Sequence, residues 1–250
     1  MGVDVNAYLE RIAFPGRPEV DLATLAALQR AHLGAVPFEN LHVFHRRAVR
    51  VDAEWSMAKV LSGRGGWCFE LNGAFAELLS AIGFTVDRLG ASVLMGDEPP
   101  PEPDHLTLVV HLSRRYLVDV GFGTSVTRPM PLDSADPVVE DHGRYRLIEV
   151  RPEVFAFQFA GDADSEFSTQ FEVPTEPRPL ESFARRSEYL ATEPGLHWTA
   201  APFATRLIPN GRVTLLSDRL KFRRDGVESV TEVADHEWAE VLARWFSMTP

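Results

Sequence analysis

Cysteine is the scarcest residue in this 250-residue sequence, occurring once, as Cys68. One cysteine excludes a disulfide framework within the chain and a zinc site built from several thiolates. The closest approach to metal-ligand spacing is His42 and His45, with no further Cys/His cluster nearby, so we expect no metal. The composition leaves open what the single cysteine does.

Positive charge is also in short supply. Lys and Arg total 25 against 36 Asp and Glu, for a formal net charge of −11. Faces that bind nucleic acid are dense in basic residues, so we expect no nucleic-acid partner. No apolar run approaches the roughly 20 residues that span a bilayer. The first residues, MGVDVNAYLERI, lack a basic start followed by an apolar run. We therefore expect a cytoplasmic protein with no secretory signal and no membrane association.

The remaining composition is that of an ordinary globular chain. Hydrophobic residues make up 45% and charged residues 24%, which excludes a disordered chain, a collagen and a coiled coil. The length suits one large domain or two to three small packed units.

The first third of the sequence predicts helices. We expect Asp21 to cap a helix that stops at Gly34, and Asp52 to cap a helix over residues 53–62. A third helix, closed by Gly83, is indicated by apolar residues at i, i+3, i+4, i+7, i+8 and i+11, namely Leu71, Ala74, Phe75, Leu78, Leu79 and Ile82.

From Thr85 the pattern changes to strands. Five segments rich in Val, Leu, Phe and Tyr are separated by turn residues: 85–95, 105–112, 116–120, 144–150 and 154–159. Prolines mark a boundary near 174–180, and after it we expect strands near 205–208, 213–216 and 227–233 and a final helix from about Asp235. Helices, then strands, then a mixed piece indicate an α+β fold with a sheet or small barrel in its middle.

Cys68 follows two glycines, in the segment Arg64-Gly65-Gly66-Trp67-Cys68, and directly precedes the third helix. Glycines permit a tight turn, and the free N–H groups of a helix N-terminus favour a thiolate, which is the nucleophilic form. The alternative is that Cys68 is simply a small buried apolar residue.

A thiolate enzyme usually needs a histidine oriented by a carboxylate or amide. Asp119 interrupts an apolar strand, where a carboxylate is costly unless it is paired. Its best-placed partner is His105, which opens the preceding strand. With the turn near Ser113–Arg114, His105 would lie opposite Phe122, so the pair must be diagonal or shifted by a bulge. His111, beside the turn, is the rival base.

At this point the sequence resembles a known family. RGGWCFELNG, DHLTLVV and LVDVGFG look like the three motifs of the arylamine N-acetyltransferases, and Pro37-Phe38-Glu39-Asn40-Leu41 and the YLERI segment at Tyr8–Ile12 match upstream signatures. The resemblance implies a helical N-terminal domain (1–84), a β-barrel middle domain (85–180) and an α/β lid (181–250). It also implies a papain-like triad with Cys68 as nucleophile, His105 as general base and Asp119 as orienting acid.

The resemblance further implies a donor and a pocket. Gly121, Phe122, Gly123 and Thr124 match the loop that lies near the acetyl-CoA phosphates in the family. The family's aromatic acceptor pocket corresponds to Phe38, Phe122 and Phe203. Trp67 stands where a tyrosine is usual before the cysteine, and His42 where a polar residue often follows the PFENL motif.

The implied reaction is ping-pong transfer of an acetyl group from acetyl-CoA, through an acetyl-cysteine, to an aromatic amine or hydrazine. Because CoA is a polyanion and the chain is acidic, the entrance must be locally basic; Arg64, Arg88 and Arg128 are candidates by sequence proximity. One alternative is an amide synthase that releases an ansamycin-type polyketide from an acyl carrier protein thioester. A thiol hydrolase and a non-enzymatic binding protein are two further alternatives.

Overall fold

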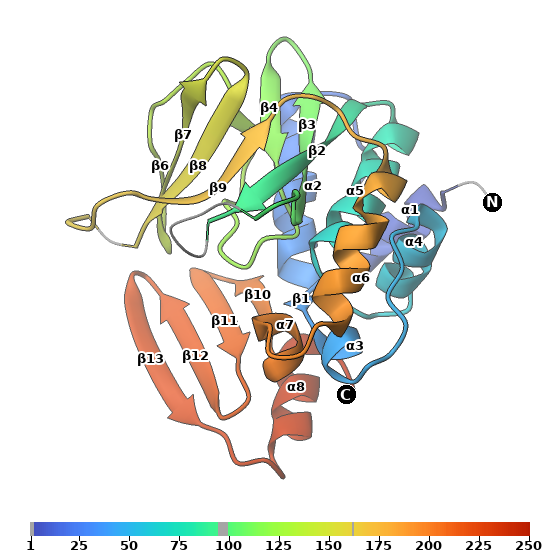
Figure 1. Ribbon diagram of the computed structural model, residues 1–250, viewed down its shortest axis with the longest axis vertical. Coiled ribbons are helices and arrows are strands. Elements are labelled where there is room, and N and C mark those ends of the chain that lie inside the picture. The colour runs from blue at the N-terminus through green and yellow to red at the C-terminus, as the bar shows by residue number, and fades with distance from the viewer. Residues whose placement is uncertain (1–2, 95–99, 162) are drawn as a thin grey trace.

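The structure is a computed structural model that describes residues 3–94, 100–161 and 163–250. Helices come first along the chain, an antiparallel sheet follows, and a second sheet with helices completes it (Figure 1). This order confirms the α+β class. The domain boundaries after residues 84 and 180 stay a prediction.

Five helices form the first third: α1 (Val5–Arg11), α2 (Leu22–Ala35), α3 (Leu41–Phe44), α4 (Ala53–Leu61) and α5 (Cys68–Ile82). Both expected caps are present. Asp21 accepts a hydrogen bond from the Thr24 N–H, and Asp52 accepts one from the Trp55 N–H, each at 2.7 Å.

The expected stop of α2 at Gly34 is wrong. The helix runs through Gly34 to Ala35, because the N–H of Val36 still donates to the carbonyl of His32 at 2.8 Å. A glycine weakens a helix without ending it when the hydrogen-bond ladder continues. In α5 the terminal glycine was assigned correctly, since Gly83 adopts a left-handed φ of +116°.

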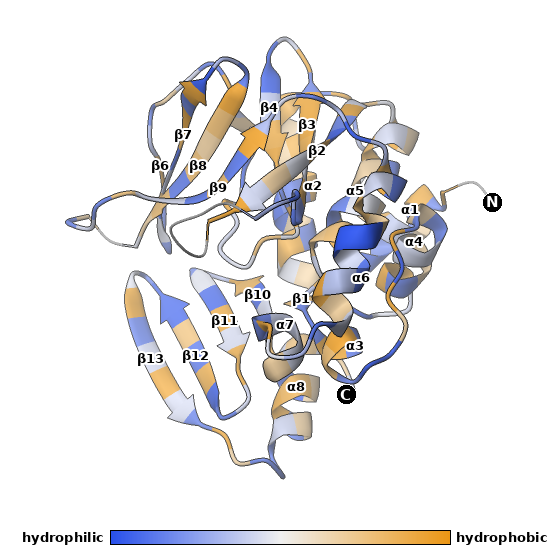
Figure 2. Ribbon diagram, in the orientation of Figure 1, coloured by the Kyte–Doolittle hydropathy of each residue, from blue (hydrophilic) through white to orange (hydrophobic). Residues whose placement is uncertain are grey.

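The middle of the chain forms one eight-stranded antiparallel sheet, in the order β5-β4-β3-β2-β9-β8-β7-β6. The sheet curls toward closure, bringing β5 near β7. Buried residues from its strands form one hydrophobic cluster, and the hydrophobic stretches of β3 and β8 are orange in Figure 2. Its strands are β2 (Thr85–Val93), β3 (His105–His111), β4 (Arg115–Val118), β5 (Met130–Pro131), β6 (Val138–Glu140), β7 (Gly143–Arg151), β8 (Val154–Ala160) and β9 (Ser168–Pro174).

All five predicted strands of this region exist, although residue 95, the predicted end of the first, lies outside the described residues. Three strands had no sequence signal that we recognised. β5 and β6 are only two and three residues long, and β9 is rich in polar residues. Several ends differ by one or two residues, and one of them concerns the site: β4 stops at Val118, so Asp119 lies just beyond the strand.

The last third holds η1 (Leu180–Phe183), α6 (Ala184–Thr192), α7 (His197–Ala200), and a second sheet followed by α8 (Trp238–Phe246). That sheet has the order β1-β10-β11-β12-β13, and its strands are β1 (Phe38–Glu39), β10 (Ala204–Ile208), β11 (Gly211–Leu215), β12 (Arg219–Arg224) and β13 (Val227–Glu232). Strand β12, with four basic residues in six, was not predicted.

Strand β1 brings a segment from the first third of the chain into the C-terminal sheet. It comes from the PFENL segment, yet it pairs with β10 at the edge of the C-terminal sheet, with Phe38 opposite Thr205. The final helix, α8, begins at Trp238 and buries Trp238, Leu242 and Phe246 in a hydrophobic cluster with Val213 and Leu215 of the C-terminal sheet. Within the described ranges, none of the helices has the length and apolar character needed to cross a bilayer.

Candidate active site

Cys68 is the first residue of α5 and is 2% exposed. The glycine turn before it packs against the PFENL segment so closely that a Cβ on Gly65 would lie 2.1 Å from the carbonyl oxygen of Pro37. Only glycine fits there. Cys68 therefore lies at a helix N-terminus, as the sequence predicted, where the first backbone N–H groups have no partner within the helix.

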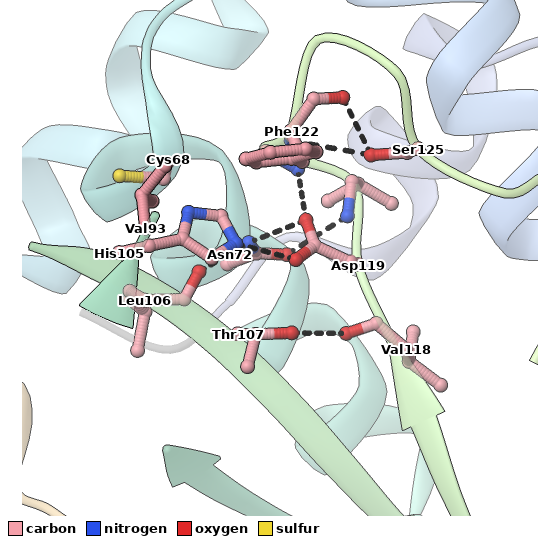
Figure 3. Close-up of polar contacts among 12 residues, drawn as sticks. Cys68, Asn72, Val93, His105, Leu106, Thr107, Val118, Asp119, Phe122 and Ser125 are labelled. Carbon is pink, nitrogen blue, oxygen red and sulfur yellow. Dashed lines mark hydrogen bonds and ion pairs between the residues drawn. The ribbon is translucent and has the colours of Figure 1, made fainter. Parts of the chain in front are cut away.

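His105 and Asp119 meet beside this cysteine. The imidazole Nε2 of His105 lies 2.6 Å from Oδ2 of Asp119, and both residues are buried (Figure 3). The β3–β4 register pairs Leu108 with Val118, one residue away from the register predicted. Its continuation would place His105 opposite Gly121 instead of Phe122. The same continuation would place Asp119 opposite Thr107, two residues from His105, so the pair is diagonal.

The second oxygen of Asp119 is also fixed. Its Oδ1 accepts hydrogen bonds from Nδ2 of Asn72 at 3.0 Å and from the N–H of Gly121 at 2.8 Å (Figure 3). The Asn72 amide also donates to the Leu106 carbonyl and accepts from the Val120 N–H. Asn72 therefore joins the cysteine helix to both strands. We did not single it out from sequence, although a polar residue four positions after Cys68 on an apolar helix was a usable signal.

The electrostatics of the site favour a charged imidazole. Burial by itself lowers the pKa of His105, but the carboxylate of Asp119 and the sulfur of Cys68 act in the opposite direction and raise it to about 10. A protonated imidazole next to a sulfur stabilises the thiolate, which is the nucleophilic form.

The loop Gly121–Thr124 passes directly over the cysteine. A Cβ on Gly121 would lie 2.7 Å from the Cα of Cys68 and 2.8 Å from Nδ2 of Asn72. At Gly123 the nearest atom to such a Cβ belongs to Phe38, at an ordinary 3.6 Å. The two glycines thus differ: the first is required by close packing and the second is not.

Cys68 and His105 open into a cavity of about 300 Å³. All the residues expected around it line it, namely Phe38, Phe203 and the loop residues Gly121, Phe122, Gly123 and Thr124. His197 and Trp198 of α7 also line it, and we did not predict them, because nothing in the local sequence marks a four-residue helix as a pocket wall. A larger cavity of about 580 Å³ lies elsewhere, between residues 43–51 and α6.

The three arginines expected at the entrance are not among the residues that line this cavity. Arg64 donates to the carbonyl of Thr249 at 2.9 Å, Arg88 pairs with Glu77, and Arg128 lies 3.5 Å from Glu140. Proximity in the sequence did not predict where these arginines point, because each of them is held by a partner from a different element.

A neighbouring cavity of about 300 Å³ contains basic side chains. It shares Thr124 with the first cavity and is lined by Arg212, Lys221 and Arg223 of the C-terminal sheet, together with Glu228, which lies 3.0 Å from Nζ of Lys221. Among the described residues, Thr124 Oγ1 and Tyr145 Oη in its wall are buried without a hydrogen-bond partner. Such atoms are usually satisfied by a ligand or ordered water.

His111 and His42 do not join the site, whereas His197 lines its cavity. His111, the rival base, bonds through Nε2 to Asp87 at 2.7 Å at the far end of β3, where both side chains are more than 30% exposed. His42 contacts the carbonyl of Ala48 at 3.1 Å. Over the described part of the chain, no group of three or more His, Cys, Asp or Glu side chains is arranged to hold a metal ion.

Comparison with known proteins agrees with this geometry. Residues 21–249 match the family model described as N-acetyltransferase. The arylamine N-acetyltransferase of Mycolicibacterium smegmatis is 34% identical over 235 residues, covering 90% of this chain and 84% of that protein. Human arylamine N-acetyltransferase 1 is 30% identical over 278 residues, covering 99% and 94%.

Solved structures agree as well. The arylamine N-acetyltransferase of Mycobacterium marinum, solved in complex with CoA, superposes with a TM-score of 0.89 at 29% identity, covering 98% of this chain and 92% of that one. A family match over most of the chain, a relative above 30% identity and a shared fold lead to one conclusion: this chain belongs to the arylamine N-acetyltransferase family and is an acyltransferase.

Proposed function

We propose that the protein transfers an acetyl group from acetyl-CoA to an arylamine or arylhydrazine by a ping-pong mechanism through an acetyl-Cys68 intermediate. One observation carries the proposal: a buried cysteine at a helix N-terminus lies beside a histidine bonded to a buried carboxylate, and all of this opens into an aromatic cavity. That arrangement is the one a thiol acyltransferase requires.

In the first half-reaction, the Cys68 thiolate attacks the thioester carbonyl of acetyl-CoA. The charge that develops on the carbonyl oxygen is stabilised by backbone N–H groups at the start of α5. The C–S bond to CoA then breaks, and CoA leaves as a thiolate that takes its proton from the His105 imidazolium. Cys68 is left as a thioester, and His105 is left neutral.

In the second half-reaction, the amine nitrogen attacks the acetyl carbonyl and neutral His105 accepts its proton. The C–S bond to Cys68 breaks, releasing the amide and restoring the thiolate–imidazolium pair. Asp119 orients His105 and stabilises its charged form throughout. Asn72 and the Gly121 N–H keep the carboxylate in position.

The acceptor class follows from the pocket walls. Phe38, Phe122, Trp198 and Phe203 surround the cavity next to the nucleophile, which suits a flat ring more than an aliphatic ammonium. An arylamine is unprotonated near neutral pH, so its nitrogen keeps the lone pair that the second half-reaction needs.

The donor's phosphates are assigned to the basic cavity beyond Thr124. Lys221, Arg212 and Arg223 supply positive charge there in a chain whose net charge is −11. Thr124 belongs to both cavities, so a thioester arm can lie along the Gly121–Thr124 loop with the anionic end in the second cavity. The M. marinum relative that was solved with CoA supports CoA as the carrier.

Intact-mass spectrometry after mixing with acetyl-CoA alone tests the proposal. We expect a gain of one acetyl group, which is absent in Cys68→Ala and removed by adding an arylamine. No adduct would overturn the acetyl-CoA proposal and direct attention to carrier-protein thioesters. Rapid hydrolysis of acetyl-CoA without an amine would instead indicate a hydrolase.

A further inference from the structure

Asn40 of the PFENL segment holds a stretch of chain more than 150 positions away. Its Nδ2 donates to the carbonyls of Trp198 and Ala201, both at 2.8 Å. Its Oδ1 accepts from the N–H of Phe203, also at 2.8 Å. Asn40 itself is 1% exposed. An amide side chain offers two donors and one carbonyl acceptor, and all three are used on this one segment.

The segment that Asn40 holds is one wall of the aromatic cavity. Trp198 and Phe203 both line the cavity, as does Phe38. The ring of Phe38 lies 5.9 Å from that of Trp198 and 5.6 Å from that of Phe203, and the last two are 5.8 Å apart, centroid to centroid. These three rings form a continuous aromatic wall, and one of them, Phe38, lies two residues before Asn40.

The wall has little regular structure of its own. Helix α7 is four residues long, and Ala201-Pro202-Phe203 follow it in an extended loop before β10. The two carbonyls that accept hydrogen bonds from the Asn40 amide are only partly buried, so water can take the place of the amide. Losing Asn40 should therefore loosen the wall without unfolding the protein.

We propose that Asn40 is a positioning residue for acceptor selection: its amide holds Trp198 and Phe203 against Phe38 and so limits the pocket to flat single-ring amines. This inference rests on the proposed acetyl transfer to aromatic amines. Within the described part of the chain, none of the side-chain hydrogen bonds of Asn40 goes to Cys68, His105 or Asp119. Its effect should therefore fall on the second half-reaction.

The two half-reactions can be measured separately. In Asn40→Ala, we expect the KM for a single-ring arylamine to rise about tenfold and the preference over a two-ring amine to shrink. The rate at which acetyl-CoA acetylates Cys68, followed by intact mass, should stay within about threefold of wild type. Asn40→Asp should behave like Asn40→Ala, because a carboxylate cannot donate to the two carbonyls. Asn40→Ser gives the same comparison should the alanine variant fold poorly.

A double-mutant cycle with Trp198→Ala tests whether Asn40 acts through the wall. Once Trp198 is removed, Asn40→Ala should raise the amine KM by less than about twofold. A matched control is Thr205→Val, which removes buried hydrogen bonds two residues from Phe203 and should leave the amine KM within about twofold.

Equal losses in both half-reactions, additive effects in the cycle, or an unchanged amine KM in Asn40→Ala would each overturn the positioning role. Failure of the proposed function looks different, because wild-type protein would then gain no acetyl group from acetyl-CoA.

Discussion

The imidazole of His105 lies 2.6 Å from the carboxylate of Asp119, although the strand pair that carries them separates one residue before Asp119. The carboxylate is held in position by Nδ2 of Asn72 and by the N–H of Gly121. The consequences of this pairing and of its surroundings can be tested one residue at a time.

The first prediction concerns the carboxylate. Asp119→Asn should lower kcat/KM by about 10²–10⁴-fold, because an amide cannot hold the charged imidazole in its orientation. Steady-state kinetics with acetyl-CoA and an arylamine measures this. Asp87→Asn is the matched control, since Asp87 makes the same kind of contact to His111 at 2.7 Å. If the two variants lost activity equally, the role assigned to Asp119 would be wrong.

The second prediction concerns pH. Although burial lowers the pKa of His105, Asp119 and Cys68 raise it to about 10, so the imidazole stays protonated across the neutral range and stabilises the adjacent thiolate. The ion pair's contribution to folding is accordingly complete below the ordinary histidine pKa of about 6.5. It is lost as pH rises through about 10.

Alkylation by iodoacetamide between pH 6 and 8 measures this pairing. The rate should be nearly constant in wild type, whereas an ordinary thiol with a pKa near 8.5 reacts about tenfold faster per pH unit in this range. In Asp119→Asn the dependence should become steep. A steep dependence in wild type would contradict the thiolate–imidazolium pair.

The third prediction compares two glycines of the loop over the cysteine. Gly121→Ala should lower kcat/KM by roughly 100-fold, because its Cβ would lie 2.7 Å from the Cα of Cys68 and displace the nucleophile. Gly123→Ala should change it less than about threefold, since its Cβ meets Phe38 at 3.6 Å. Thermal unfolding of both variants separates activity from stability. Equal kinetic effects would show that close packing is not the reason for Gly121.

The fourth prediction concerns the donor. Lys221→Met should raise the KM for acetyl-CoA about threefold to tenfold and leave the KM for the amine unchanged, because Lys221 lines the basic cavity. Arg128→Gln removes the same charge beside Glu140, outside that cavity, and serves as the control. The increase for Lys221→Met should diminish at high salt. A larger effect from Arg128→Gln would place the phosphates elsewhere.

Local patterns were sufficient for much of the fold. Capping by Asp21 and Asp52, the apolar stripe of α5 and five of the eight strands of the large sheet were predictable, because each depends on residues within one element. The errors have two causes. The hydrogen-bond ladder of α2 itself continues past Gly34, whereas β12 forms because it pairs with β11 and β13, and such pairing overrides local propensity.

The same distinction between local sequence and contacts among elements applies to the functional site. The sequence by itself determined which groups we propose for the chemistry: a single cysteine after a glycine turn at a helix N-terminus, one histidine opening a strand, and one carboxylate in apolar surroundings. Only the tertiary structure decided how they meet, through the ladder that ends at Val118 and the amide of Asn72. It also decided the pocket wall, since Asn40 and Trp198 are brought together by β1 joining the C-terminal sheet. Contacts across such sequence distances depend on how the elements pack, which no local pattern records.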